Sequence, residues 1–328
     1  TGYSSLDRVK LIDLAFAKVQ RTFGFYPESV GAWWIDSKSL SYMEEKYGVK
    51  AALVVADQFS TDRYQVWGQY FGTPYYPDKE NLLFPAQSTE RKLPVVITQW
   101  AARDPLNGYG EGVNETTYSV QANDYVEYHD LDTKYFSKLL DIYTKQRFNK
   151  FGQVTIGLEN SYPWSDFSKE YENQISEILN RARGSEFTVL TMSGFAKWYS
   201  ENFPGTSPPH IIEADDPLGT DQKVVWFMNP FYRAGWFYTK DGVSFRDLRQ
   251  YIPGQSEICA NNPCQELNLA QSITRVLDDI TFKTKWVLDK GKISDFSLQR
   301  SEEKYILGYK NEAGVSKTIE FLPRDLSI

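Results

Sequence analysis

The chain has 328 residues, of which 41% are hydrophobic and 24% are charged; this composition is typical of globular proteins and excludes a largely disordered chain. The net charge is −7 at pH 7, and no cluster of Lys and Arg is interleaved with aromatic residues, so we expect neither nucleic acid nor an anionic membrane surface as a partner. Aromatic residues make up 16% of the chain, which suits a surface that stacks on sugar rings but also a large aromatic core.

The first hundred residues predict two helices and three strands; the second helix is short, carries Leu40, Met43 and Tyr47, and ends at Gly48. Apolar residues at three- and four-residue spacing over 4–23 predict an amphipathic helix, with Ser4 and Asp7 in capping-box positions. Each of the first two predicted strands ends in an acid, and the third runs into a polar loop: 29–36 ends in Asp36, 51–57 ends in Asp57, and 94–102 is followed by Asp104 and Glu111. The aromatic segment 58–91, between the second and third predicted strands, is long for a loop, and loops of this length commonly contribute to a binding or catalytic site.

Two further strands and three helices are predicted before residue 205. The alternating residues Val154, Ile156 and Leu158 predict a buried strand that delivers Glu159 into a loop. The remaining predicted elements are a helix over 131–148, a helix over 167–182, a strand over 186–192, and a helix that Ser193 can cap and that carries Trp198 and Tyr199. Five strands that alternate with helices predict a parallel sheet, and in a chain of this length a (β/α) barrel or part of one.

The pattern changes after residues 204–210, where apolar and polar residues begin to alternate between Gly, Asn and Asp turns, as in antiparallel sheets. We therefore predict an α/β protein with an incomplete (β/α) barrel, the catalytic domain, over 1–206, and a β-rich accessory domain of antiparallel strands over 207–328. The second domain either buttresses the barrel or adds aromatic residues such as Trp226 and Trp236 to the substrate surface.

Three features bear on the compartment of the protein. Cys259 and Cys264 flank the turn residues Asn-Asn-Pro, which predicts a local disulfide and an exported or cell-surface protein; two unrelated thiols in a cytosolic protein are the alternative. No apolar run approaches the roughly 20 residues that cross a bilayer, and no signal peptide is present. Because the first residue is Thr1 and not Met, we expect that upstream sequence has been removed.

The leading catalytic candidate is Glu159, in the stretch VTIGLENSYPW. Ligands of α/β folds bind at the carboxyl ends of the strands, and a carboxylate is placed there among aromatic residues; capping of the next helix is the alternative role. Asp57 or Asp36 is the expected partner carboxylate, with Asp104 and Glu111 as loop alternatives. The expected substrate-binding residues, each of which could instead belong to the core, are Trp33, Trp34, Trp67, Trp100, Asp104 and Trp164.

The order of these segments resembles the superfamily of the polysaccharide deacetylases and the family-57 and family-38 glycoside hydrolases, which share an incomplete, seven-stranded βα barrel. The similarity covers about residues 1–205. The segment GFYPESVGAWWIDSKSLSYMEEKYGVKAALVVADQ is similar to the middle region of the deacetylases, and VTIGLENSYPW with the following helix and EFTVLTMSGFAKWYSENFP is similar to the catalytic-acid region of family 57.

This sequence departs from the superfamily at two points. Family-57 enzymes usually carry an Asp two residues before the matching Glu, where this chain has Gly157. The two strands that carry the deacetylase metal ligands are not visible, and the two His residues, His129 and His210, do not form a spaced pair. Either the chain lacks the first two βα units of such a barrel, or its first helix packs where they would lie.

The resemblance and the strand-end acids together predict a carbohydrate-active hydrolase that cleaves glycosidic bonds of a polysaccharide or oligosaccharide with two carboxylates and no metal or other cofactor. One alternative is a metal-dependent polysaccharide deacetylase in which Asp57 and His129 are remnants of the metal site. A carbohydrate-binding protein without catalysis is the other. Serine-nucleophile hydrolysis is disfavoured because the chain has no GxSxG motif, and nucleotide binding because it has no suitable Gly-rich loop.

Overall fold

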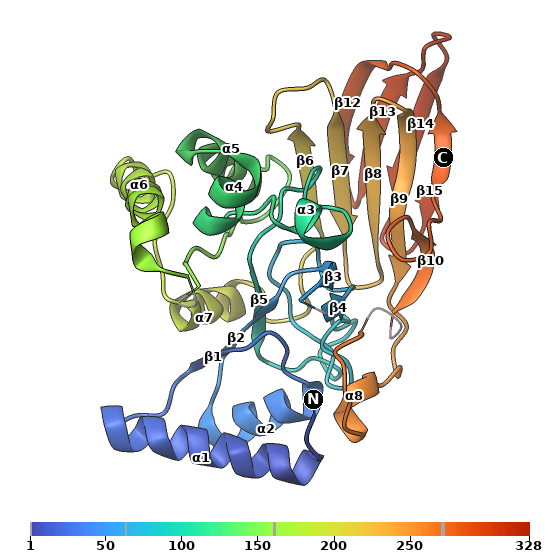
Figure 1. The fold of residues 1–328 in the computed structure, drawn as a ribbon. Helices are drawn as coiled ribbons and strands as arrows, with labels where there is room; N and C mark the ends of the chain where they lie inside the picture. Colours follow the sequence, from blue (N-terminus) through green and yellow to red (C-terminus); the bar gives the residue numbers. More distant parts are fainter. Residues whose placement is uncertain (1, 63, 160–161, 270–272) are drawn as a thin grey trace.

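The computed structural model describes residues 2–62, 64–159, 162–269 and 273–328 (Figure 1). The predicted first helix is confirmed as α1 (Ser5–Phe23): the Ser4 side chain accepts a hydrogen bond from the Asp7 amide, and the helix ends at Gly24, whose φ of 84° favours glycine. Helix α2 (Ser37–Tyr47) packs beside it, so that the pair lies at one end of the molecule.

Three short strands form a parallel sheet in the order β1-β2-β5. They are β1 (Ser29–Gly31), β2 (Ala51–Val55) and β5 (Val96–Trp100). Gly31 and Thr98 both pair with Leu53, which aligns these three residues across the sheet. Successive side chains of a strand point to opposite faces: Val54 and Ile97 enter the main hydrophobic core, whereas the face that carries Leu53 borders a cavity.

The long aromatic segment after β2 contains the hairpin β3 (Gln58–Thr61) and β4 (Tyr64–Val66). Helices fill most of the stretch between β5 and residue 203. They are α3 (Gly112–Thr116), α4 (Ala122–His129), α5 (Thr133–Thr144), α6 (Trp164–Arg183) and α7 (Met192–Asn202). The predicted helices over 131–148 and 167–182 are thus confirmed as α5 and α6.

The predicted strands over 154–159 and 186–192 are wrong: the first segment is irregular, and the second is irregular up to Met192, where α7 begins. Within the described residues, no backbone hydrogen bond joins either segment to the sheet, and the described strands include no closed barrel. The alternation of Val154, Ile156 and Leu158 has another cause, because these side chains line the cavity beside the sheet. Alternation shows which side chains are apolar, but not whether a strand partner lies within reach.

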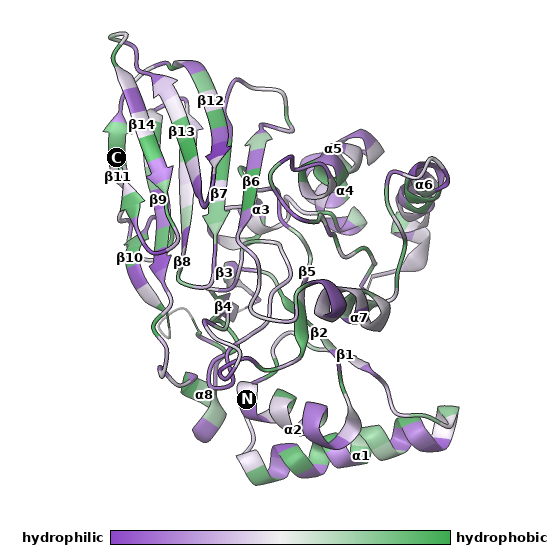
Figure 2. Cartoon of the chain, turned by 180° about the vertical axis from the view of Figure 1, so that it is seen from behind, coloured by the Kyte–Doolittle hydropathy of each residue, from purple (hydrophilic) through white to green (hydrophobic). Residues whose placement is uncertain are grey.

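The C-terminal region forms two antiparallel sheets (Figures 1 and 2). The first sheet contains β6 (His210–Asp215), β7 (Lys223–Met228), β8 (Tyr232–Thr239), β9 (Gly242–Gln250), β10 (Thr274–Asp278) and β11 (Trp286–Asp289). The second contains β12 (Ser294–Ser301), β13 (Lys304–Lys310), β14 (Ser316–Phe321) and β15 (Leu326–Ser327). The mixed α/β architecture with a C-terminal antiparallel β region is therefore as predicted.

Residues on both sides of the first C-terminal sheet are buried. Phe227 and Trp236 share a core cluster with Leu307 of the second sheet, whereas Trp226 and Met228 share the main core with residues of the parallel sheet. This sheet is consequently the middle layer of the molecule. The domain boundary between residues 206 and 207 stays a prediction, since the hydrophobic interior continues across it.

Two smaller features complete the fold. The predicted disulfide between Cys259 and Cys264 is confirmed and encloses the short helix α8 (Ile258–Asn261). In the part of the chain that the structure describes, no helix combines the length and the apolar character needed to cross a membrane.

A buried network of charges joins the C-terminal sheet to the end of β2. Arg233 on β8 is 0% exposed; it forms an ion pair with Asp57 directly after β2 and a two-pronged pair with Asp247 at 2.9 and 3.0 Å. Arg249 extends the network, with Nε 2.9 Å from Asp247 and Nη2 2.9 Å from Asp278. Buried charges of this kind are tolerated because each has an opposite partner.

Replacing Arg233 with Met should remove the partner of two buried carboxylates and lower the free energy of unfolding by about 3–5 kcal/mol. The matched control is Arg147→Met, since the Arg147 side chain is 58% exposed and its pair with Glu213, at 3.3 Å, is open to solvent. Urea denaturation of both variants measures the difference. Equal losses in the two variants would contradict a stabilising role for the buried network.

Candidate functional site

A small polar pocket of about 80 Å³ lies at the carboxyl ends of the parallel strands. Each strand is followed by residues that line it: Trp33 after β1, Gln58 after β2, and Arg103 after β5. The other lining residues come from β3 and the turn after it, the end of β5, α3, α4 and the loop before α6: Thr61, Asp62, Trp100, Ala101, Val113, Thr116, Thr117, Gln121, Asp124, Tyr128, Glu159 and Tyr162. The loops after a parallel sheet therefore converge on one polar site, as expected for α/β folds.

Three carboxylates line this pocket: the exposed Asp62, and Asp124 and Glu159, which one glutamine side chain connects. The side-chain Nε2 of Gln121 donates to Asp124 Oδ1 at 3.1 Å and to Glu159 Oε2 at 3.4 Å. The two oxygens can thus be no further apart than about 6.5 Å, the sum of these distances, so one bound molecule can contact both. Asp124 lies in the first turn of α4, and its Oδ2 also accepts a hydrogen bond from Ser119 Oγ at 2.8 Å.

Burial makes Asp124 and Glu159 hold a proton more readily than usual. Burial raises the pKa of Asp124 against the opposing charge of Arg103, 3.9 Å away, and the charge of Glu159 adds a smaller increase; the resulting pKa is about 6. Burial also raises the pKa of Glu159, partly offset by the hydrogen bond from Gln121. A carboxyl group that is protonated near neutral pH can act as a general acid.

Two N–H groups of this pocket have no partner among the described residues. They are Nε2 of Gln58 and Nε of Arg103, and both side chains are buried. Unpaired buried donors are costly and uncommon, and here both nitrogens are covered by surrounding protein atoms. The aromatic wall of the pocket includes Trp33 and Trp100, which can stack on sugar rings.

The structure brings together three of the residues predicted for the site, Glu159, Trp33 and Trp100. Asn160 and Ser161 of the same sequence motif lie outside the described residues. The catalytic and substrate-binding roles of the three residues stay predictions.

The two acids expected to partner Glu159 lie elsewhere, each paired with an arginine. Asp57 belongs to the buried network with Arg233. Asp36 caps α2 by accepting a hydrogen bond from the Ser39 amide, and its Oδ2 lies 2.7 Å from Arg8. Neither carboxylate lines the polar pocket, so Asp124 takes the place that the sequence analysis gave to them.

The remaining predicted residues are also outside the polar pocket. Trp34 and Trp67 are buried; the first donates to Glu257 at 2.8 Å, and the second stacks on a tyrosine with ring centroids 5.5 Å apart. Asp104 is fully buried and accepts hydrogen bonds from its own loop and from the Tyr135 hydroxyl. Trp164 is exposed at the start of α6, and Glu111 pairs with Lys283 at the surface.

Sequence reasoning missed Asp124, Gln121, Gln58 and Arg103. Asp124 stands in a polar stretch at the start of a helix, where acids commonly serve as favourable charges near the helix N-terminus. Its position therefore carries no separate sign of catalysis. Only the arrangement of α4 against the end of β5 shows that it faces Glu159.

The metal-dependent alternative requires a set of nearby ligands. Across residues 2–62, 64–159, 162–269 and 273–328, no group of three or more His, Cys, Asp or Glu side chains could hold a metal ion. His129 stacks on Tyr118 with its Nε2 2.9 Å from Thr117 Oγ1, and His210 is buried. These residues do not fit the metal centre of a deacetylase, and we derive no step through a metal.

Residues 5–207 match a protein family described as a domain of unknown function with a solved structure, DUF3863. The chain belongs to this family. No curated protein matches the chain.

The fold is also found in a crystal structure described as a "putative glycoside hydrolase/deacetylase" from Parabacteroides distasonis. The two structures superpose with a TM-score of 0.69 over 82% of this chain and 68% of that chain, at 16% sequence identity. At this identity the likeness shows the fold alone. It supports the broad glycoside hydrolase/deacetylase-like architecture of this DUF3863 chain, but not membership of family 57 or family 38.

The buried side chain of Glu257, near Asp36, gives a prediction about how stability changes with pH. Glu257 accepts hydrogen bonds from the Trp34 indole and the Ser37 amide, and burial raises its pKa from 4.5 to about 8. Between these pH values the folded protein keeps a proton that the unfolded chain releases. The contribution to stability is therefore complete below the unfolded pKa and is lost as the pH rises toward 8.

We expect the free energy of unfolding to fall as the pH is raised from 6.5 to 8, a window above the pKa of about 6 of Asp57 and Asp124. In Glu257→Gln the slope should be smaller because this residue no longer titrates. Glu201→Gln, at an exposed position, is the matched control and should keep the wild-type slope. Urea denaturation at several pH values measures it; an unchanged slope in Glu257→Gln would refute the assignment.

Proposed function

We propose that this protein is a glycoside hydrolase that acts on an oligosaccharide or polysaccharide with Asp124 and Glu159 as its two carboxylates. The observation that supports the proposal most directly is the side chain of Gln121, which donates to both carboxylates across the polar pocket. Glycoside hydrolysis needs two carboxyl groups separated by roughly 5 to 9.5 Å, on opposite sides of the bond that is cleaved. The bound of about 6.5 Å on the two bridged oxygens is compatible with this requirement.

The environments of the two groups suggest different roles. Asp124 is the more deeply buried group, and its pKa of about 6 lets it donate a proton to the leaving oxygen at mildly acidic pH. Glu159 is only partly buried and has one long hydrogen bond, so its carboxylate is free to attack the sugar or to activate water. The hydrogen bonds from Gln121 hold the two carboxylates at a separation that lets one substrate contact both.

Substrate recognition in this proposal uses the rest of the pocket. The polar side chains that line the pocket, such as Gln58, Thr117 and Gln121, offer hydrogen-bonding groups to sugar hydroxyls. Trp33 and Trp100 stack on the apolar faces of the sugar. No cofactor takes part in this scheme.

We also propose that the protein works outside the cytoplasm, either secreted or at the cell surface. The support is the disulfide between Cys259 and Cys264, because such bonds persist mainly in oxidising compartments. A polysaccharide outside the cell would be an accessible substrate there.

The proposal is tested with a panel of aryl glycosides and polysaccharides, with and without EDTA. On the substrates of this panel whose leaving group must be protonated, Asp124→Asn and Glu159→Gln should each lower kcat/KM by roughly 100- to 10,000-fold, because each removes a group that transfers a proton or attacks. The control is Glu127→Gln, an exposed glutamate on the same helix as Asp124, which should stay within about twofold of the wild type.

Activity that survives both active-site substitutions would overturn the proposal. Loss of wild-type activity with EDTA would favour the metal-dependent deacetylase instead. A protein that binds oligosaccharides but cleaves none of them would be a carbohydrate-binding protein.

The assignment of roles has its own test. Wild-type kcat/KM with a poor leaving group should fall as the pH rises above about 6, because Asp124 then loses the proton it must donate. Asp124→Asn should retain activity on a dinitrophenyl glycoside, whose leaving group needs no proton, whereas Glu159→Gln should lose activity on both substrates and regain it with added azide. The reverse pattern would exchange the two roles.

A further inference from the structure

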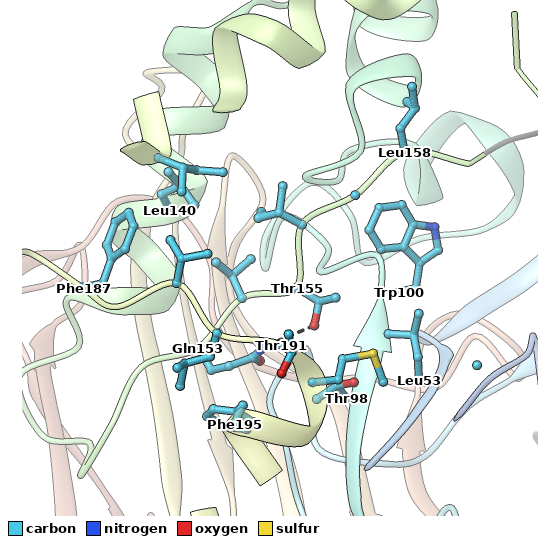
Figure 3. Close-up of a pocket in the computed structure, with 18 of the residues that line it drawn as sticks. Leu53, Thr98, Trp100, Leu140, Gln153, Thr155, Leu158, Phe187, Thr191 and Phe195 are labelled. Carbon is cyan, nitrogen blue, oxygen red and sulfur yellow. Dashed lines mark hydrogen bonds between the residues drawn. The ribbon is translucent and has the colours of Figure 1, made fainter. Parts of the chain in front are cut away.

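A second, larger cavity lies directly beside the polar pocket (Figure 3). Its volume is about 850 Å³, within the roughly 300–1,000 Å³ of typical small-molecule sites. One wall is the face of the parallel sheet that carries Gly31, Leu53 and Thr98, which pair across the three strands. The opposite wall is formed by the irregular segments 152–159 and 187–191, with α5, α6 and the start of α7 closing the remainder.

Apolar side chains dominate the lining of this cavity. Leu140, Leu158, Phe187 and Phe195 project into it from four different elements in Figure 3. The polar side chains there are mostly threonines, and Gln153 donates to Thr155 at 3.0 Å. Among the described lining residues, Glu159 is the one side chain that carries a charge. Apolar cavities hold water poorly and take up apolar ligands.

The cavity and the polar pocket share three residues, Trp33, Trp100 and Glu159. Glu159 is a member of the carboxylate pair, so the apolar space begins where the proposed cleavage occurs. A group attached to the oxygen of the cleaved bond would therefore have an apolar space of sufficient size within reach. A sugar ring is a poor occupant, because its hydroxyl groups would face leucine, isoleucine and phenylalanine side chains without hydrogen-bond partners.

We propose that the substrate is a glycoside with an apolar alkyl aglycone, and that the cavity binds this alkyl group while the sugar occupies the polar pocket. The inference rests on the proposed glycoside hydrolase function and deepens it. Burial of each methylene group contributes up to about 0.8 kcal/mol, so the cavity would select substrates by the length of the alkyl chain.

Gly31 offers a way to fill the cavity without touching the carboxylates. A Cβ added there would meet Leu53 at 3.5 Å, an ordinary contact, so a leucine side chain can enter the space. The matched control is Gly205→Leu, at a position where a Cβ meets nothing within 4 Å and which lies outside the described cavities.

The experiment compares octyl and methyl glycosides of the same sugars, in both anomeric forms, below the micelle concentration. In the wild type and Gly205→Leu, kcat/KM for the octyl glycoside should exceed that for the methyl glycoside by at least about tenfold. In Gly31→Leu this preference should disappear, with methyl glycoside cleavage within about twofold of the wild type. Retained cleavage of the methyl compound shows that the variant folds.

Two results distinguish failure of the inference from failure of the proposed function. Equal kcat/KM values for the two glycosides in an active wild type would overturn the alkyl-binding inference and leave the hydrolase proposal standing. If neither glycoside is cleaved, calorimetric titration with octyl β-D-glucopyranoside tests the cavity directly. Binding that is lost in Gly31→Leu but kept in Gly205→Leu supports the cavity as an alkyl site. Absence of binding to the wild type overturns the alkyl-binding inference.

Discussion

The ion pair between Arg233 and Asp57 is the interaction on which the position of the polar pocket depends. Asp57 is followed directly by Gln58, which lines the pocket, and its Oδ1 also accepts a hydrogen bond from the Gly68 amide. Arg233 therefore fixes the end of β2 and the loop around Gly68 from a strand of the C-terminal sheet. Among the described pocket residues none comes from that sheet, so it supports the site without forming it.

The buried acids that support the fold differ from those in the polar pocket in how fully a nearby positive charge compensates their burial. Asp57 and Asp36 each lie beside an arginine that compensates their burial. Asp124 has Arg103 only at 3.9 Å, and Glu159 has no ion pair among the described residues. An incompletely compensated carboxylate is poorly suited to stabilise a fold, but its raised pKa is useful for proton transfer.

Local patterns in the sequence predicted the elements that local interactions define. Ser4 and Gly24 bound α1 as capping rules require, and the turn between Cys259 and Cys264 brings the two sulfurs together. The partner of Asp57 could not be predicted, because Arg233 is 176 residues away and nothing near either residue indicates the pair. Glu159 was found because it ends an apolar stretch, although that stretch lines a cavity and is not a strand.

Family-57 enzymes usually carry an Asp where this chain has Gly157, and the surroundings of this glycine leave little room for a side chain. A Cβ on Gly157 would lie 3.2 Å from the indole ring of Trp100, tighter than ordinary contacts, so an aspartate side chain at this position would displace that ring. Trp100 lines both the polar pocket and the apolar cavity. The carboxylate that Gln121, at the start of α4, links to Glu159 is Asp124. A search along the sequence for a fixed spacing cannot detect this pair, because its two members come from different elements.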